Sequence, residues 1–201
     1  MKIAFLYAGQ GSQRVGMGRD LYDASPAFRA AFDAGHLDFD LHALCFEGAQ
    51  ETLNQTQYTQ PCMVAFACGV TAALFDAGLR PDYAAGLSLG EYSALEASGV
   101  LTAQSAIELA AYRGAAMAKA SEGIQSAMTA VLGLDREALM RCCDEAGALG
   151  VVQICNYNCP GQIVIGGEAA AVARAGELAK EAGARRLLPL RVSGPFHTPL
   201  M

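Results

Sequence analysis

The stretch Tyr83-Ala84-Ala85-Gly86-Leu87-Ser88-Leu89-Gly90 joins a short apolar run to a G-x-S-x-G pattern. Residues 83–87 are typical of a β-strand, and an amphipathic helix over 89–97 follows directly. Glycines on both sides of Ser88 permit a tight strand-to-helix turn, which would hold the serine hydroxyl above the sheet beside the first N–H groups of the helix. The stretch therefore predicts a layered α/β fold with Ser88 as a nucleophile. The alternative is a tight turn that carries an idle serine.

Strands and helices alternate on both sides of this stretch. A strand is predicted over 3–7, and helices are predicted over 26–34, 60–77 and 102–119. This alternation, together with the serine turn, indicates an α/β-hydrolase-like large domain with a parallel sheet. We expect it to comprise residues 1–124 and 192–201.

Residues 125–191 have a different order of predicted strands and helices, which indicates a small second domain. Strands are expected over 127–132, 151–155, 162–165 and 186–190, helices over 135–146 and 168–183, and a turn over 156–161. The order β-α-β-β-α-β is that of a ferredoxin-like unit.

Composition excludes several classes of protein. The 201 residues are 53% hydrophobic and 17% charged, which excludes a disordered chain, and the net charge of −6 argues against binding to nucleic acid. The apolar run 62–75 is too short to cross about 30 Å of hydrocarbon, so we expect a buried helix and no membrane contact. Seven cysteines, an odd number, favour reduced thiols and a cytoplasmic protein. Their spacing predicts no metal site, and the sequence contains no cofactor motif.

A serine nucleophile needs a base, and the chain has three histidines, His36, His42 and His197. His197 ends the run Ser193-Gly194-Pro195-Phe196-His197, a loop after a predicted strand, which is a common place for a catalytic group. His197 is therefore the candidate base, against the alternative of a surface loop. The other two histidines are expected on the solvated surface.

Two further features fit a nucleophilic serine. The glycine-rich loop Gly9-Gln10-Gly11-Ser12-Gln13 follows the first strand, so the N–H groups of Gln10 and Leu89 are candidates for an oxyanion hole. Arg113 lies in a long alanine-rich helix between apolar neighbours one turn away on each side. It either pairs with a substrate carboxylate or extends outward into solvent.

Taken together, these motifs resemble the malonyl-CoA:acyl carrier protein transacylases and the acyltransferase domains of fatty-acid and polyketide synthases. The motifs that carry the resemblance occur in order along the whole chain. They are Gly9-Gln10-Gly11-Ser12-Gln13, Thr59-Gln60-Pro61, Gly86-Leu87-Ser88-Leu89-Gly90-Glu91, Tyr112-Arg113-Gly114 with Met117, Asn156-Tyr157-Asn158-Cys159-Pro160-Gly161-Gln162, and Gly194-Pro195-Phe196-His197.

The resemblance implies a transfer of malonyl from coenzyme A to the phosphopantetheine thiol of acyl carrier protein, in fatty-acid biosynthesis and without a cofactor. Ser88 would form the malonyl ester, and His197 would act as base and then as acid. Gln10 and Leu89 would supply the oxyanion hole, and Arg113 would pair with the malonyl carboxylate. The resemblance also implies that substrate is bound by Met117, Asn156 and Phe196, and Phe196 favours malonyl over methylmalonyl.

The sequence departs from the family pattern in two places. Leu87 stands where many members have a histidine, which we expect to tune activity. Members also extend well past the catalytic histidine, so we expect this chain to lack a C-terminal segment that completes the large domain. A carrier protein is acidic, and the candidate docking residues are basic: Lys180, Arg185, Arg186 and Arg191.

Three other functions are compatible with the same motifs. One is a serine esterase or thioesterase, although no convincing triad acid lies between Ser88 and His197. Another is the malonyl transfer subunit of a malonate decarboxylase. The last is an inactive truncated fragment.

Overall fold

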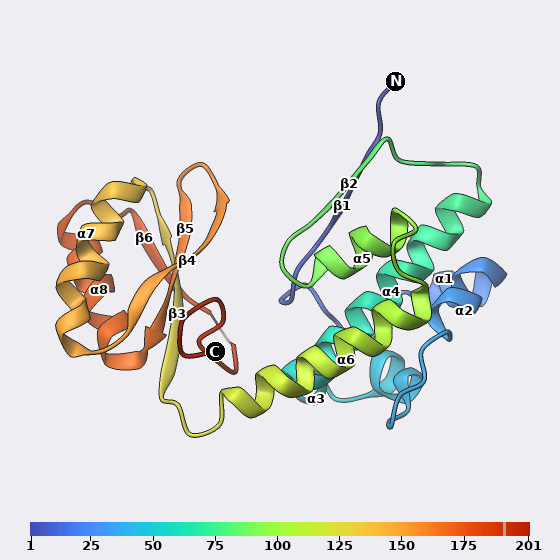
Figure 1. The fold of residues 1–201 in the computed structure, drawn as a ribbon, viewed down its shortest axis with the longest axis horizontal. Helices are drawn as coiled ribbons and strands as arrows, with labels where there is room; N and C mark the ends of the chain where they lie inside the picture. Colours follow the sequence, from blue (N-terminus) through green and yellow to red (C-terminus); the bar gives the residue numbers. More distant parts are fainter. Residues whose placement is uncertain (191) are drawn as a thin grey trace. The chain divides into compact units, whose positions relative to one another are not determined.

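The computed structural model describes residues 1–190 and 192–201. The chain forms two compact units, Met1–Ala116 and Met117–Met201 (Figure 1). Residues 117–124 and 192–201, which we assigned to the large domain, group here with the second unit. The two-segment composition of the large domain stays a prediction.

The first unit combines a two-stranded parallel sheet with a helical core. Strand β1 (Ala4–Tyr7) pairs with β2 (Tyr83–Gly86), and Phe5 lies opposite Ala84. The remaining elements are α1 (Arg19–Ala24), α2 (Pro26–Phe32), the π-helical turn η1 (Ala43–Glu47), α3 (Gln50–Leu53), α4 (Thr56–Asp76), α5 (Gly90–Ala97) and α6 (Ala103–Ala120). Helices α1, α3 and η1 were not predicted, because elements of four to six residues carry too little periodicity.

Side-chain caps and glycines set the ends of these helices. The Ser25 hydroxyl accepts the Phe28 N–H at 3.1 Å, and the Thr102 hydroxyl accepts the Ser105 N–H at 3.1 Å. Gly78 follows α4 with φ of 80°, the left-handed conformation of a C′ glycine.

Helix α4 is the core helix of the first unit. It begins at Thr56, four residues before the predicted start. The apolar pattern did not reveal this first turn, because Thr56 and Thr59 are polar residues although both are fully buried. The apolar run is thus part of a helix that is long and apolar enough to span a membrane by length and composition alone. In this unit α4 packs against α2, and the core around it includes Phe28 and Ile107.

The second unit has the ferredoxin-like order that the sequence predicts. Its elements are β3 (Ser126–Leu132), α7 (Arg136–Ala146), the 3₁₀ turn η2 (Gly147–Leu149), β4 (Val152–Cys159), β5 (Gln162–Glu168), α8 (Ala169–Glu181) and β6 (Arg186–Pro189). The strands are antiparallel in the order β4-β5-β3-β6. The Asp135 carboxylate caps α7 by accepting the Ala138 N–H at 2.8 Å.

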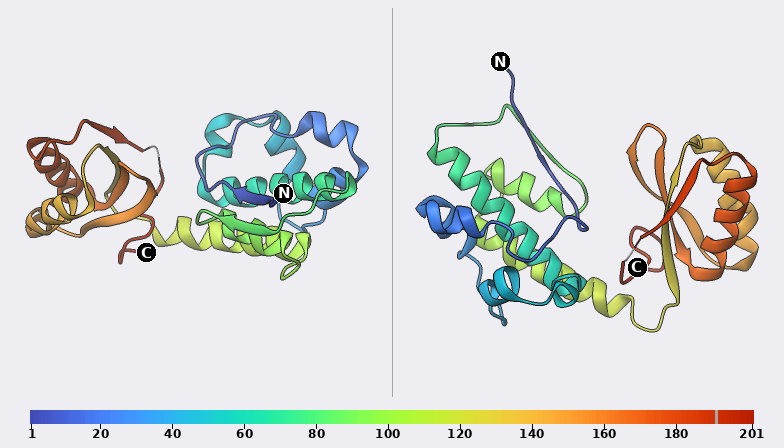
Figure 2. Two further views of the ribbon diagram at one scale, coloured as in Figure 1. Left: turned by 90° about the horizontal axis from the view of Figure 1, so that it is seen from above. Right: turned by 180° about the vertical axis from the view of Figure 1, so that it is seen from behind.

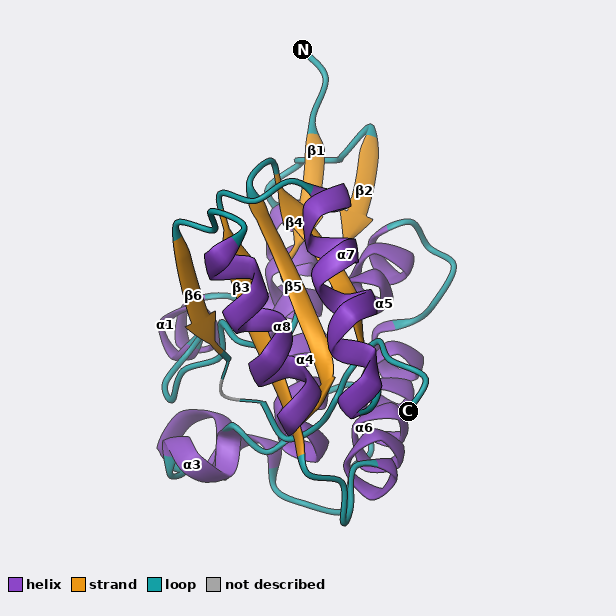
Figure 3. Cartoon of the chain, turned by 90° about the vertical axis from the view of Figure 1, so that its left-hand side faces the viewer, coloured by secondary structure: helices purple, strands orange, loops and turns teal. Residues whose placement is uncertain are grey.

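Both faces of this antiparallel sheet are covered. Helices α7 and α8 pack on one face (Figures 2 and 3), where Val131, Ile165 and Leu139 are buried. On the other face, Ala130 and Val164 pack with Phe196. This arrangement follows from the two-residue alternation along each strand.

The turn predicted over 156–161 is wrong in extent. Strand β4 continues to Cys159, so only Pro160-Gly161 forms the turn, with Gly161 at φ of 82°. The register shifts between Ile154 and Asn156, and this β-bulge allows polar Asn156 to continue the strand opposite Val164.

Candidate active site

The turn between β2 and α5 has the geometry of a nucleophile elbow. Ser88 has φ of 52°, a strained left-handed conformation for a residue with a Cβ. A Cβ on Gly86 would collide with the backbone of Gly90, and a Cβ on Gly90 would collide with the Tyr7 carbonyl oxygen. Only glycine fits at both positions, and the close approach holds Ser88 where β2 ends and α5 begins.

Two backbone N–H groups beside this elbow have no hydrogen-bond partner within the described residues. They belong to Leu89, which precedes α5, and to Gln10, in the loop after β1. That loop passes against the elbow, since a Cβ on Gly9 would lie 2.9 Å from the Leu87 carbonyl oxygen. The Gln10 side chain holds the loop on α4 by donating to the Thr56 hydroxyl at 3.1 Å. Unpaired donors of this kind suit an oxyanion.

Arg113 reaches the serine. Its Nη2 donates to Ser88 Oγ at 3.1 Å, and its Nη1 donates to Gln60 Oε1 at 2.7 Å. The guanidinium also lies over the Tyr92 ring, 5.9 Å from its centre. Of the two orientations considered for Arg113, the side chain therefore turns inward and does not extend into solvent. Its pairing with a substrate carboxylate stays a prediction.

Close packing of α6 on α4 explains this orientation. A Cβ on Gly114 would lie 2.8 Å from the Thr56 carbonyl oxygen, so glycine lets the two helices approach. Gln60 then fixes one side of the planar guanidinium and leaves the other directed at Ser88.

Gln60 was not predicted as a site residue. In the sequence, Thr59-Gln60-Pro61 stands out only as a family motif at a helix start. The side chain is fully buried in α4, and an amide in an otherwise apolar helical run is the signal that could have revealed it.

The candidate residues of the second unit lie on and beside its sheet. His197 has φ of 62°, and its carbonyl oxygen accepts the Gln153 side-chain N–H at 2.8 Å. Phe196 is 7% exposed and packs with Met128 and Val164, and Met117 contacts the same cluster. The loop is tight, since a Cβ on Gly194 would collide with the Ser121 hydroxyl.

Burial makes several thiols of the chain poor nucleophiles. It raises the pKa of Cys68, and it raises the pKa values of Cys143 and Cys155 to about 12. The pKa of Cys62 is raised by its contact with the Cys45 thiol and by burial. The thiolate is the reactive form, so these groups are inert near neutral pH, in keeping with the predicted core role of the cysteines.

Comparison with known proteins identifies the family. Residues 4–201 match the acyl transferase domain. The chain belongs to this family. It is 47% identical over 203 residues to the malonyl CoA-acyl carrier protein transacylase of Bacillus subtilis (strain 168), covering 100% of this chain and 64% of that protein. Against the transacylase of the same name from Escherichia coli (strain K12), identity is 42% over 207 residues, with 100% and 66% covered.

Solved structures of the family have the same fold. The transacylase from Streptococcus pneumoniae superposes with a TM-score of 0.92 at 50% identity, covering 99% of this chain and 66% of that one. A malonyl-transacylase in complex with a type II PKS acyl-carrier protein gives a TM-score of 0.95 at 42% identity, with 100% and 66% covered. These matches confirm the predicted fold class and family. The chain spans about two thirds of the length of these relatives.

Proposed function

We propose that this chain transfers a malonyl group from coenzyme A to the phosphopantetheine thiol of acyl carrier protein through a malonyl ester on Ser88. The observation that carries the proposal is the hydrogen bond from Arg113 to Ser88 Oγ at 3.1 Å, with the guanidinium fixed by Gln60. An acyl group attached to Ser88 would bring its own carboxylate within reach of this guanidinium, which binds carboxylates through a bidentate fork. The relatives named above are transacylases for malonyl, which supports this substrate.

In the first half-reaction, Ser88 Oγ attacks the thioester carbonyl while His197 takes the hydroxyl proton. The N–H groups of Gln10 and Leu89 receive the oxyanion of the tetrahedral intermediate. The carbon–sulfur bond then breaks, and His197 returns the proton to the departing thiol. The products are malonyl-Ser88 and free coenzyme A.

In the second half-reaction, the carrier thiol attacks malonyl-Ser88. His197 takes the thiol proton and returns it to Ser88 Oγ as the ester bond breaks. Each half-reaction conserves protons and needs no cofactor.

We assign substrate selection to residues of both units. Arg113 favours an acyl group with a carboxylate, and Phe196 favours malonyl over the larger methylmalonyl. Met117 and Asn156 are proposed to contact the substrate. The seven free cysteines support a reducing, cytoplasmic location.

Carrier protein would dock on basic side chains of the second unit. Lys180, Arg185 and Arg186 are exposed near the end of α8 and the start of β6, and an acidic partner complements their charge. Arg191, the remaining candidate, lies outside the described residues.

Intact-mass spectrometry before and after incubation with malonyl-CoA tests the proposal. We expect the mass of one malonyl group to be added to the parent chain and to be absent from Ser88→Ala. Ser98→Ala, a change at an exposed serine just after α5, is the matched control and should acylate like the parent. Release of free malonate without a thiol acceptor would instead indicate a thioesterase, and an adduct that persists in Ser88→Ala would refute the assigned nucleophile.

A further inference from the structure

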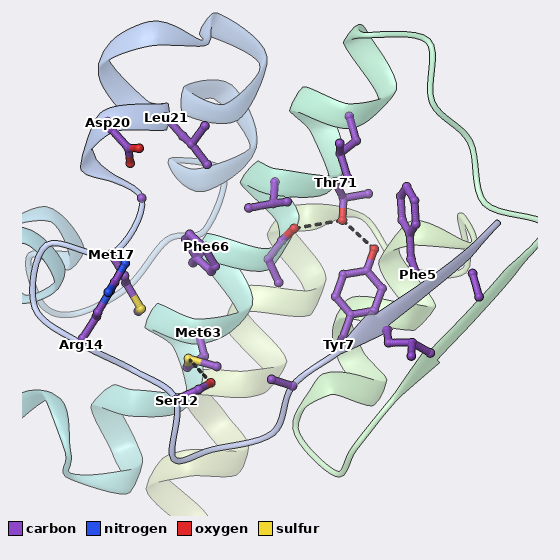
Figure 4. A pocket seen from close by; sticks show the side chains of 17 residues that line it. Phe5, Tyr7, Ser12, Arg14, Met17, Asp20, Leu21, Met63, Phe66 and Thr71 are labelled. Atoms are coloured by element: carbon purple, nitrogen blue, oxygen red, sulfur yellow. Dashed lines mark hydrogen bonds between the residues drawn. The ribbon is translucent and has the colours of Figure 1, made fainter.

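The loop that carries Gln10 lies along the first turns of α4. The Gln10 side chain donates to the Thr56 hydroxyl at 3.1 Å. Two residues further along the loop, the Ser12 hydroxyl points at the Met63 sulfur (Figure 4) and lies 3.9 Å from it. A thioether sulfur is a weak acceptor, so the bond between Gln10 and Thr56 is the stronger of these two contacts.

Thr56 and Gln60 lie one helical turn apart on α4, and both are fully buried. Residues four positions apart share a face of a helix and are separated by about 6 Å along its axis. Thr56 holds Gln10, whose N–H is a candidate oxyanion donor, and Gln60 holds Arg113. One turn of helix therefore fixes the distance between the oxyanion donor and the guanidinium.

A second contact fixes Thr56 relative to α6. A Cβ on Gly114 would lie 2.8 Å from the Thr56 carbonyl oxygen, so the main chains of α4 and α6 touch directly beside Arg113. Packed main chains of this kind do not shift without opening a void. The position of Thr56 is thus set by the two helices, and its hydroxyl positions the loop.

We propose that Thr56 is a positioning residue that sets the length of the acyl group, an inference that rests on the proposed function. In the ester on Ser88, the carbonyl oxygen must reach the Gln10 N–H while the terminal carboxylate reaches Arg113. Malonyl has one carbon between these two groups and succinyl has two, so a fixed distance fits only one of them. The Arg113 guanidinium lies 3.1 Å from Ser88 Oγ, which favours the shorter acyl group.

The test compares the rates at which malonyl-CoA and succinyl-CoA acylate the chain, measured by time-resolved intact-mass spectrometry. The parent should prefer malonyl. Thr56→Val removes the hydroxyl at nearly constant shape and should lower the ratio of the malonyl rate to the succinyl rate about tenfold, because a misplacement of about 1 Å can cost about 100-fold in rate. Thr56→Ser keeps the hydroxyl and should keep most of the parent's ratio.

Thr71→Val is the matched control. Thr71 is 1% exposed on the same helix, and its hydroxyl lies 2.7 Å from the Tyr7 hydroxyl (Figure 4), so this variant also loses a buried polar contact. It should melt at a lower temperature than the parent and keep the parent's ratio of rates. An equal change of the ratio in Thr56→Val and Thr71→Val would be a general effect of a destabilised α4, and it would overturn the proposal.

Two further results would overturn the assignment of Thr56. If Thr56→Val lowered the malonyl and succinyl rates equally, or left both unchanged, the hydroxyl would not set the acyl length. If Thr56→Ser lost the ratio as completely as Thr56→Val, the hydroxyl would not be the group responsible. A parent chain that forms no acyl ester at all would instead refute the proposed function, and this inference with it. The two failures are distinguishable, because only the failure of the proposed function is seen in the parent.

Discussion

The two sheets of this chain differ in how completely they are packed. In the second unit, Ile165 lies in a central strand, and both faces of the sheet are covered, by helices on one side and by Phe196 on the other. In the first unit, β1 and β2 are covered by helices on one face, and Leu6 is 79% exposed on the other. Yet the turn after β2 carries Ser88, so the candidate chemistry lies on the less complete sheet.

This difference shows that the geometry of the turn at Ser88 does not depend on a sheet that is packed on both faces. The elbow is set by short-range constraints, namely Gly86, Gly90 and the N-terminus of α5. Its support comes from α4 and α6, whose packing brings Arg113 and Gln60 to Ser88. A bare sheet face therefore coexists with an assembled set of polar contacts.

The largest expected effect is a difference in stability between truncations in the two sheets. Ile165→Ala should destabilise the second unit by about 2–5 kcal/mol, because Ile165 is fully buried and its removal leaves a cavity. Leu6→Ala should change the stability of the first unit by less than about 0.5 kcal/mol, because its side chain is already in solvent.

Hydrogen exchange followed by mass spectrometry measures both effects, because peptides from 1–116 and 117–201 report on each unit separately. Val164→Ala, in the same strand but directed to the other face, is the comparison within the second unit. If Leu6→Ala and Ile165→Ala lowered the stability of their units equally, the β1–β2 face would be packed in solution.

The sequence predicted some elements of the two units closely and missed others. Elements with strong local signals were predicted closely, such as the capped helix after Asp135 and the turn at Ser88. The start of α4 was missed because Thr56 and Thr59 are fully buried polar residues whose hydroxyls find partners inside the protein. The Thr59 hydroxyl donates to the Leu53 carbonyl at 2.5 Å, and the Thr56 hydroxyl accepts from the Gln10 side chain at 3.1 Å. The sequence also could not show that Gln60 fixes Arg113, since these two residues are 53 positions apart in the chain.

A second prediction tests whether the site of the first unit recognises a carboxylate. Arg113→Ala should lower the rate of acylation by malonyl-CoA about 10- to 100-fold, the usual cost of losing a hydrogen-bonded charge. Acylation by acetyl-CoA should fall less, because acetyl has no carboxylate to pair. Arg113→Lys should recover part of the malonyl rate, since it keeps the charge and loses the fork.

Time-resolved intact-mass spectrometry of the Ser88 adduct gives both rates. Arg141→Ala, at an exposed arginine on α7 of the second unit, is the control and should acylate like the parent. Parallel losses for malonyl and acetyl would mean that Arg113 acts on Ser88 itself and not on the substrate carboxylate.

The two units also differ in whether a carboxylate that lies among packed elements has a hydrogen-bond partner. In the second unit, the Glu168 carboxylate accepts the Val151 N–H at 2.6 Å. In the first unit, the Glu96 Oε2 on α5 is buried and has no hydrogen-bond partner within the described residues. Burial raises the pKa of Glu96 to about 7, because an unpaired charge is poorly solvated there.

The smallest expected effect follows from this carboxylate. Because the pKa of Glu96 is higher in the folded chain than in the unfolded chain, the folded chain holds the proton more tightly. Stability from this group is present below the unfolded pKa, near 4.5, and is lost as the pH rises through about 7. Glu96→Gln should therefore melt at most a few degrees above the parent at pH 8, since partial exposure screens the charge, and the difference should shrink toward pH 5.

Glu91→Gln, at an exposed position on the same helix, should show no such dependence in parallel thermal melts. A melting difference for Glu96→Gln that is the same at both pH values would mean that the carboxylate is ionised throughout. The first unit would then tolerate an unpaired charge beneath its open sheet.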